Sequence, residues 1–387
     1  MAINQDSIIG VIGSGAMGAG IAHVAAVAGH QVVLYDTNDQ ALDRAKKNLT
    51  STLQKLQEKG KITSAEDVLG RVSFADNIVE FSHCGLIIEA IIEKLEVKQE
   101  LFQKLATQNS SETILASNTS TIPITQIAAA VSNPERVVGM HFFNPAHLMK
   151  LVEIISGEKT NDQTTQLSFQ LAAKWGKTAV LAKDRPGFIV NRIGKMYHTE
   201  PLHLLEKNVA DANTIDALLE SSGFKMGPFA LMDYIGHDVN YVVTKTVFES
   251  FFYDPRYKPS FSQNRLLEAG WLGRKSGRGF YDYSEGAENP APAEDTALSK
   301  EICERILVML INEAVDALHL NVATAADLET AMTKGVNYPK GLLSWCDEWG
   351  AAKCLEKLDS LYNNYHEDRY RASCLLRKYA VENKKFV

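Results

Sequence analysis

The chain has 387 residues, of which 45% are hydrophobic and 22% are charged, and its formal net charge is −7. This length predicts two or three domains, and this balance is that of a globular protein able to bury a sizeable core. The acidic charge excludes the basic surface of a nucleic-acid-binding protein, so no nucleic-acid partner is expected.

The five cysteines are scattered and lack C-x-x-C spacing, and the ten histidines form no H-E-x-x-H motif. These patterns argue against a metal site and a disulfide framework, and they fit a reducing compartment. Residues 8–29 are apolar, but several glycines interrupt them and no basic segment precedes them. A signal peptide or membrane span is therefore not expected, and the sequence favours a cytoplasmic protein.

The N-terminal segment predicts a nucleotide-binding βαβ unit, with strands at 7–12 and 31–35 around a helix of small residues. The turn before the helix contains a G-x-G-x-x-G pattern, made of Gly13, Gly15, Ala16, Met17 and Gly18 together with Ser14. In such a loop the first glycine permits the tight turn, the second lets the backbone approach a pyrophosphate, and the third brings the helix against the strand. We expect this loop to bind a dinucleotide.

Asp36 predicts which dinucleotide binds. It closes the second strand, 18 residues after Gly18. A carboxylate there accepts hydrogen bonds from both ribose hydroxyls and repels a 2′-phosphate, and residues 37–39 provide no arginine to bind such a phosphate. NAD is therefore favoured over NADP.

Residues 40–61 predict an amphipathic helix with a lysine-rich polar side. A charged side of this kind is usually only solvated, and the functional alternative is attraction for a phosphorylated substrate tail. Further strands are expected at 85–91, 114–117, 137–143 and 151–155, with helices between the earlier ones. This alternation predicts a mainly parallel, doubly wound sheet.

His141 and Glu153 bracket an apolar stretch that runs between the last two of these strands. Buried ionisable groups are costly unless they pair, and ligands bind at the carboxyl ends of the strands in such sheets. His141 lies near such an end, and Glu153 lies on the next strand. We expect the two side chains to reach each other.

The chain resembles the (3S)-3-hydroxyacyl-CoA dehydrogenases of fatty-acid β-oxidation. The matching stretches span roughly residues 7–283 in family order: IGSGAMGAGIA, IIEKLEVKQELF, ASNTSTI, MHFFNPAHLMKLVE, PGFIVNR, MGPFALMDYIG and LGRKSGRGFY. The resemblance implies a Rossmann-type α/β NAD-binding domain followed by all-α C-terminal domains. It also implies NAD-dependent, reversible oxidation of a 3-hydroxyacyl-CoA to the 3-oxoacyl-CoA.

The resemblance implies roles for individual residues. His141 resembles the catalytic base, Glu153 the carboxylate that orients it, and Ser120 and Asn191 the polar pair near the reacting carbon. The other implied contacts are Asn144 with nicotinamide, Glu93, Lys98, Ser120 and Lys275 with the cofactor, and Thr52 and Lys59, by a looser match, with coenzyme A. Two residues depart from the family pattern: His147, which could be mistaken for a second base, and Pro201, which predicts a kink in a helix beginning near Phe188.

The second half of the chain contains a repeat. Glu200 and Glu313 are 113 residues apart, and Gly236 and Gly350 are 114 apart, within matching helical patterns. Such even spacing indicates duplication. We expect an NAD-binding domain at 1–186, a first helical copy at 187–283, a linker at 284–298 and a second, degenerate copy at 299–387.

The second copy lacks equivalents of PGFIVNR and of the LGRKSG loop, so we expect it to be structural. In single-copy relatives this domain mediates dimerisation, and the duplication allows either a homodimer or a pseudo-dimeric monomer. The duplicated arrangement resembles dehydrogenases of the phenylacetate pathway that act on 3-hydroxyadipyl-CoA, and their 3-hydroxybutyryl-CoA relatives. Two alternatives stay open: a dehydrogenase of a free hydroxy acid or sugar acid, and a non-catalytic, crystallin-like binding protein.

Overall fold

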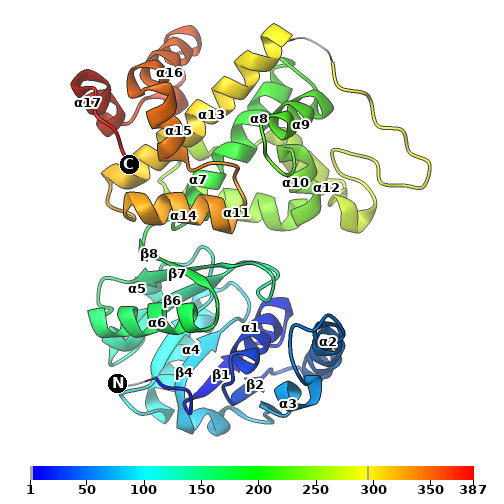
Figure 1. Ribbon diagram of the computed structural model, residues 1–387, viewed down its shortest axis with the longest axis vertical. Helices are drawn as coiled ribbons and strands as arrows, with labels where there is room; N and C mark the ends of the chain where they lie inside the picture. The colour runs from blue at the N-terminus through cyan, green and yellow to red at the C-terminus, as the bar shows by residue number, and fades with distance from the viewer. Residues whose placement is uncertain (1–2, 294–295) are drawn as a thin grey trace. The chain divides into compact units, whose positions relative to one another are not determined.

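The computed structural model describes residues 3–293 and 296–387, and the chain forms two compact units, Met1–Phe188 and Ile189–Val387. The first unit is built around a sheet, and the second is helical (Figure 1). The expected linker at 284–298 includes residues 294 and 295, which lie outside the described residues. Its last part is helical, because helix α13 begins at Thr296.

The first unit contains eight strands in the order β3-β2-β1-β4-β5-β6-β7-β8. Their bounds are β1 Ile8–Ile12, β2 Val32–Tyr35, β3 Val72–Phe74, β4 Cys84–Glu89, β5 Ile114–Ser117, β6 Val137–Phe142, β7 Leu151–Ser156 and β8 Thr178–Lys183. All neighbouring pairs are parallel except β6 and β7. The expectation of a mainly parallel sheet is confirmed, whereas β3 and β8 were not predicted.

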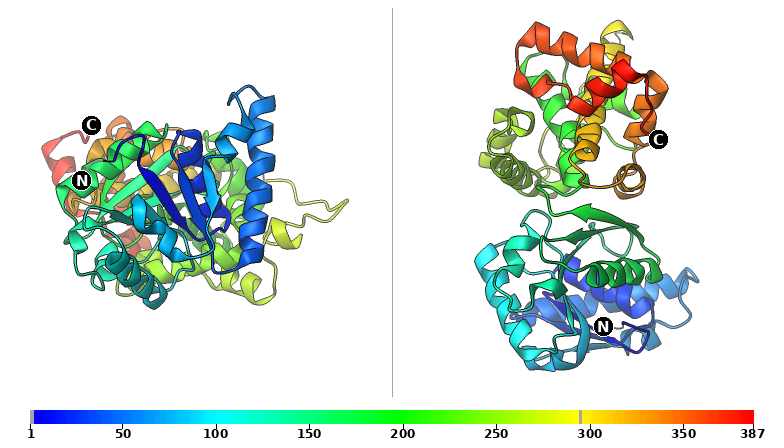
Figure 2. Two further views of the ribbon diagram at one scale, coloured as in Figure 1. Left: turned by 90° about the horizontal axis from the view of Figure 1, so that it is seen from below. Right: turned by 90° about the vertical axis from the view of Figure 1, so that its left-hand side faces the viewer.

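The helices of this unit connect the strands and pack on the sheet (Figure 2). They are α1 Ala16–Val27, α2 Asp39–Glu58, α3 Ala65–Leu69, α4 Leu95–Gln108, α5 Ile124–Ala128 and α6 Asp162–Lys174, with 3₁₀ turns at η1 Ile78–His83 and η2 Pro134–Arg136. Helix α1 joins α6 and the strands in one hydrophobic core. Helix α2 ends before residue 61, where it was expected to end, because Gly60 adopts a φ of +64°.

The antiparallel pair β6–β7 sets the register of the candidate site. Only residues 143–150 connect these strands, and a parallel pair would need a crossover of a dozen or more residues. The chain therefore turns back, and His141 lies directly opposite Glu153.

The second unit contains two series of helices that follow each other in the same order. The first series is α7 Val190–Gly194, α8 Met196–Glu206, α9 Ala212–Ser221, α10 Pro228–Ile235, α11 His237–Ser250, η3 Pro255–Tyr257 and α12 Phe261–Glu268, followed by η4 Arg274–Ser276. The second is α13 Thr296–His319, α14 Ala325–Gly335, α15 Leu342–Trp349, α16 Ala351–Tyr365, η5 Asp368–Tyr370 and α17 Cys374–Glu382. Gly236 and Gly350, both at positive φ, join corresponding helices.

The two series differ at their first helix. In the second series α13 is continuous, whereas in the first series the helix is divided at Lys195 into α7 and α8. The sequence predicted the interruption at Pro201, and that position was wrong, because Pro201 lies inside α8. A proline removes one backbone donor, and a short helix can accept that loss without ending.

Each copy places a buried glutamate among basic and phenolic groups of the other copy. Glu313, from the second copy, accepts hydrogen bonds from Arg192 Nε at 2.5 Å and from the Tyr257 hydroxyl at 2.5 Å. Arg256 pairs with the same carboxylate at 3.3 Å.

The reciprocal cluster surrounds Glu200 of the first copy. Its carboxylate accepts hydrogen bonds from Arg305 Nε at 2.6 Å and from the Tyr370 hydroxyl at 3.1 Å, and Arg369 pairs with it at 2.8 Å. Each group of this cluster lies 113 residues from its counterpart in the Glu313 cluster. The two copies therefore exchange equivalent contacts, as two subunits of a symmetric dimer do.

Candidate functional site

The glycine loop joins β1 to α1, and the surroundings of its glycines differ. A Cβ on Gly18 would lie 1.7 Å from the Gly13 carbonyl oxygen, and a Cβ on Gly13, whose φ is +98°, would lie 2.4 Å from the Ala90 carbonyl oxygen. By contrast, no atom lies within 4 Å of the Cβ position of Gly15. The loop is therefore closed against the protein at two glycines and open at the third.

The open position lies at the start of a helix. Gly15 is the N-cap of α1, and in the described part of the chain no side chain caps this helix and no acidic residue occupies its first turn. The first N–H groups of a helix carry partial positive charge and bind phosphate groups. The space at Gly15 thus fits the pyrophosphate of a dinucleotide.

Asp36 lies beside this loop, directly after β2. Its Oδ2 accepts hydrogen bonds from the Ser14 N–H at 2.7 Å and the Ser14 hydroxyl at 2.9 Å, and its Oδ1 accepts one from the Asn38 N–H at 3.0 Å. Ser14 was not singled out from the sequence, although a hydroxyl inside a glycine loop is a usable signal. These contacts hold the carboxylate at the edge where a ribose would bind.

A buried ion pair lies at the ends of β4 and β5. Lys98 Nζ lies 2.6 Å from Glu89 Oε1, and both side chains are almost fully buried. Glu89 also accepts hydrogen bonds from the Ile91 N–H at 2.7 Å and from the Ser117 hydroxyl at 2.6 Å. Glu89 was missed in the sequence, because it ends a strand that reads as apolar.

Glu93 joins this pair to the loop after β5. Its carboxylate lies 3.2 Å from Lys98 Nζ and accepts hydrogen bonds from the Thr119 hydroxyl at 2.6 Å and the Ser120 N–H at 2.9 Å. Burial acts to raise the pKa of Glu93, but the Lys98 ammonium and these hydrogen bonds outweigh it, so that the pKa is lowered. Three predicted positions, Glu93, Lys98 and Ser120, are thus brought together.

His141 and Glu153 form a close pair. His141 Nδ1 lies 2.6 Å from Glu153 Oε2, and His141 is 6% exposed while Glu153 is fully buried. The rings of Phe143 and Phe188 lie 4.5 Å and 5.9 Å from the imidazole, centre to centre. Because a carboxylate only accepts, Nδ1 is the donor of this bond, and Nε2 of the neutral ring is left as a base.

The loop after β6 carries Asn144, which is joined to Pro145 by a cis peptide bond. The Lys177 ammonium donates hydrogen bonds to the carbonyls of Ala146 and Met149 in this loop, the latter at 2.8 Å. Burial lowers the pKa of Lys177 to about 8. These contacts tie the loop to the residue that precedes β8.

His147 lies in the same loop and contacts α1. Its ring centre lies 5.3 Å from that of His23, a buried residue of α1. Burial lowers the pKa of His23 to about 4, with smaller contributions from His147 and Lys177. This histidine therefore stays neutral at ordinary pH.

Thr52 and Lys59 lie at the end of the first unit's longest connection, α2. Thr52 is a half-buried helical residue, and Lys59 is the exposed C-cap residue. They are seven residues apart, which is about two helical turns, so they lie on the same side of the helix.

Two predicted site residues, Asn191 and Lys275, belong to the second unit. Asn191 lies in α7, and Lys275, in η4, forms an ion pair with Asp238. The other predicted residues lie in the first unit, where the cofactor loop and the His141–Glu153 pair follow the ends of β1, β4, β5 and β6.

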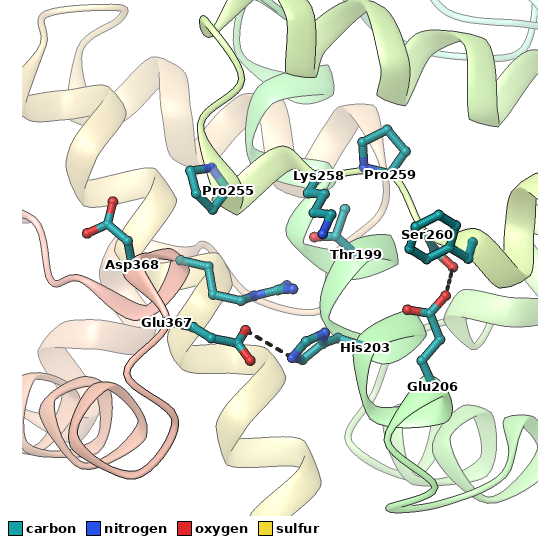
Figure 3. Close-up of a pocket in the computed structure, with 11 residues that line it drawn as sticks. Thr199, His203, Glu206, Pro255, Lys258, Pro259, Ser260, Glu367 and Asp368 are labelled. Atoms are coloured by element: carbon teal, nitrogen blue, oxygen red, sulfur yellow. Dashed lines mark hydrogen bonds and ion pairs between the residues drawn. The ribbon is translucent and has the colours of Figure 1, made fainter.

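A cavity of about 410 Å³ lies in the second unit (Figure 3). It is lined by residues of α8, the segment around η3 and α12, and the segment around η5. Figure 3 shows His203 paired with Glu367 and Ser260 donating to Glu206. None of the predicted site residues lines this cavity, so it does not enter the candidate site.

Two further searches cover residues 3–293 and 296–387. No helix in these ranges has the length and the apolar character needed to cross a membrane. The same residues include no group of three histidine, cysteine, aspartate or glutamate side chains arranged to hold a metal ion.

The chain matches two related family descriptions. Residues 8–185 match "3-hydroxyacyl-CoA dehydrogenase, NAD binding domain". Residues 187–283 and 302–386 match "3-hydroxyacyl-CoA dehydrogenase, C-terminal domain". The two stretches of the second match correspond to the two series of helices.

Individual relatives agree with this match. The 3-hydroxyadipyl-CoA dehydrogenase of Escherichia coli (strain K12) is 38% identical, and the alignment covers 98% of each chain. A probable 3-hydroxybutyryl-CoA dehydrogenase of Deinococcus radiodurans is 43% identical over 71% of this chain and 99% of its own. The crystal structure of a 3-hydroxybutyryl-CoA dehydrogenase from Escherichia coli K12 superposes with a TM-score of 0.92 at 36% identity, covering 98% of this chain and 99% of that one.

Proposed function

Since the chain belongs to the 3-hydroxyacyl-CoA dehydrogenase family and is an NAD-dependent oxidoreductase, we propose that His141 is its general base and that Glu153 orients this base. The observation that carries the proposal is the 2.6 Å contact between His141 Nδ1 and the fully buried Glu153 carboxylate. This contact holds the imidazole in the tautomer that leaves Nε2 free to take a proton.

The reaction removes a hydroxyl proton and a hydride from C3 of the acyl group. When bound, NAD accepts the hydride at its nicotinamide ring. His141 Nε2 takes the hydroxyl proton, and the imidazolium that forms is stabilised by the Glu153 carboxylate. In the reverse direction the same imidazolium returns the proton to the developing alkoxide.

Other residues bind and position the reactants in this proposal. Ser120 and Asn191 donate hydrogen bonds to the oxygen on C3, where charge develops during the reaction. Asn144 binds the nicotinamide amide, and Lys98 and Glu93 hold the nearby loop in place. The support for these roles is the match of each residue to a family motif and, for Glu93 and Ser120, their direct contact.

We propose a short-chain or six-carbon dicarboxylic 3-hydroxyacyl-CoA as substrate. The support is the names of the relatives, which act on 3-hydroxyadipyl-CoA and 3-hydroxybutyryl-CoA. Thr52 and Lys59, on one side of α2, are proposed to contact the coenzyme A moiety, whose phosphates a lysine attracts.

The test is NADH oxidation at 340 nm with acetoacetyl-CoA, with NADPH as the cofactor control. We expect rapid turnover with NADH, and a loss of kcat of about 10²–10⁴-fold in His141→Ala, the usual scale for losing a general acid or base. Glu153→Gln should lose activity on the same scale, because an amide does not stabilise the imidazolium. His319→Ala, an exposed histidine of α13, is the matched control and should keep wild-type activity.

Two results would contradict the proposal. If His141→Ala retained wild-type kcat, another group would be the base. If the wild-type protein bound NADH but turned over no 3-oxoacyl-CoA, the substrate would be sought among free hydroxy acids.

A further inference from the structure

Lys195 is a buried lysine without a carboxylate partner among the residues described. It is 4% exposed, and its ammonium donates one hydrogen bond, of 3.2 Å, to the Thr244 hydroxyl. That hydroxyl is itself donated to the Asn240 carbonyl at 2.8 Å, so only its oxygen faces the lysine. A cation removed from water in this way costs several kcal/mol unless a counter-ion is supplied.

The surroundings of Lys195 are otherwise neutral. His198, one turn along α8, accepts a hydrogen bond from the Asn240 amide at 3.0 Å and is fully buried from water on that side. Burial, then the charge of Lys195, lowers the pKa of His198 well below its ordinary value. Burial also lowers the pKa of Lys195 to about 7, which shows how little in the protein stabilises its positive charge.

The repeat provides an internal comparison. The residue of the second copy that lies 113 positions after Lys195 is Val308, and it is fully buried in the continuous helix α13. The same helical packing is thus achieved with an apolar side chain. Packing therefore does not require a lysine here, and only the copy that contains Asn191 carries one.

Lys195 follows Asn191 by four residues. Residues four apart lie on the same side of a helix, about 6 Å apart along its axis. In the proposed function Asn191 contacts the oxygen on C3 of the acyl group. In a six-carbon dicarboxylic acyl group the terminal carboxyl carbon is three bonds beyond C3, a distance comparable with one helical turn.

We propose that Lys195 binds the terminal carboxylate of a dicarboxylic 3-hydroxyacyl-CoA and so selects this substrate over one that ends in a methyl group. The inference rests on the proposed role of Asn191 and adds the residue that recognises the far end of the acyl chain. A carboxylate beside the ammonium supplies the missing counter-ion, and a methyl group would leave the ammonium unpaired.

The test compares kcat/KM for 3-hydroxyadipyl-CoA and 3-hydroxyhexanoyl-CoA, which differ only at the last carbon. We expect the wild-type protein to prefer the diacid. Lys195→Val, which introduces the residue of the second copy, should lower kcat/KM for the diacid about 100-fold and change that for the hexanoyl substrate by less than about threefold. Lys195→Arg should retain most of the preference, and Lys245→Val, at an exposed lysine of α11, should leave it unchanged.

Binding of the unreactive adipyl-CoA and hexanoyl-CoA, measured by calorimetry, separates this inference from the proposed function. If the wild-type protein turns over neither hydroxyacyl substrate but Lys195→Val still weakens adipyl-CoA binding selectively, the proposed function fails and the inference stands. Equal losses for both ligands in Lys195→Val, with Lys195→Met behaving in the same way, would mean that the lysine is structural. An unchanged preference in both variants would also overturn the inference.

Discussion

Glu89 illustrates how a single buried residue supports the candidate site without touching a reactant. Its carboxylate binds the Lys98 ammonium, the Ser117 hydroxyl and the Ile91 N–H, and thereby joins the ends of β4 and β5 to the first turn of α4. The segments that follow these strands carry Glu93 and Ser120. A carboxylate with three donors is fully satisfied, so its burial is tolerated.

Glu89→Gln should destabilise the first unit. Removing one charge of a buried pair leaves the other uncompensated, which typically costs about 3–5 kcal/mol. We expect a lower urea midpoint of unfolding for Glu89→Gln and an unchanged midpoint for Glu96→Gln, an exposed glutamate of α4. The double variant Glu89→Leu with Lys98→Met should lose less than the two single variants together, and full additivity would contradict the pairing.

The element that most affects the cofactor side of the site is the loop 143–150 between β6 and β7. It carries Asn144, and two of its carbonyls accept hydrogen bonds from Lys177. On its other side it contacts α1 closely, since a Cβ on Gly20 would lie 3.0 Å from the Ala146 Cβ. The loop is thus held between the dinucleotide helix and the start of β8.

Lys177→Met should loosen this loop. We expect KM for NADH to rise about tenfold, because losing hydrogen bonds from a charged donor costs about 1.5–3 kcal/mol and Asn144 loses its fixed position. The expected change in kcat is smaller, since His141 and Glu153 are held by the sheet itself. Lys174→Met, at an exposed lysine in the last turn of α6, is the control, and an equal effect of both changes would refute the assignment.

The contact between α1 and this loop should also depend on pH through His23. Its pKa is about 4 in the folded protein and near 6.5 in the unfolded chain, so folding favours the neutral ring. The stability it permits is fully present above pH 6.5 and is lost as the pH falls from 6.5 toward 4. Relative to His23→Leu, the wild-type protein should lose about 2 kcal/mol of unfolding free energy between pH 7.5 and pH 5. Parallel pH profiles of the two proteins would contradict this.

At the scale of the whole molecule, the second helical unit contains its own dimer-like arrangement. Arg192, Arg256 and Tyr257 of the first copy surround Glu313 of the second, and the equivalent groups of the second copy surround Glu200 of the first. The Deinococcus radiodurans relative, by contrast, matches only 71% of this chain over nearly all of its own length. The duplication supplies within one chain what a second subunit would otherwise provide.

We therefore expect the protein to be a monomer in solution. The buried charges of both copies are already paired inside the chain, so a dimer through the same faces would require separating them. Sedimentation equilibrium should give a mass of 42.7 kDa that does not change with protein concentration. A species of twice this mass at micromolar concentration would contradict the expectation. Glu313→Gln should lower the thermal midpoint without producing dimers.

Local patterns in the sequence predicted the features that depend on neighbouring residues. The glycine loop, the carboxylate after β2, the parallel strands and the repeat spacing all follow from backbone sterics and from periodic burial, which act over a few residues. The brevity of the 143–150 connection likewise makes β6 and β7 antiparallel and places Glu153 opposite His141. The strands that were missed, β3 and β8, are short or half-exposed and carry weak periodicity.

What only the tertiary structure decided are the contacts between distant segments. Glu89 looks like the end of an apolar strand until Lys98 and Ser117 are seen beside it, and Lys195 looks like a solvent-exposed lysine until it is found buried. The exchange of Arg192 and Arg305 between the copies is likewise invisible in the chain order. Such pairs depend on which surfaces meet when the chain packs, and the identity of one residue does not specify a partner a hundred positions away. The sequence by itself thus determined the fold class and the chemistry of the cofactor site, and packing decided which buried charges are paired and which one awaits a ligand.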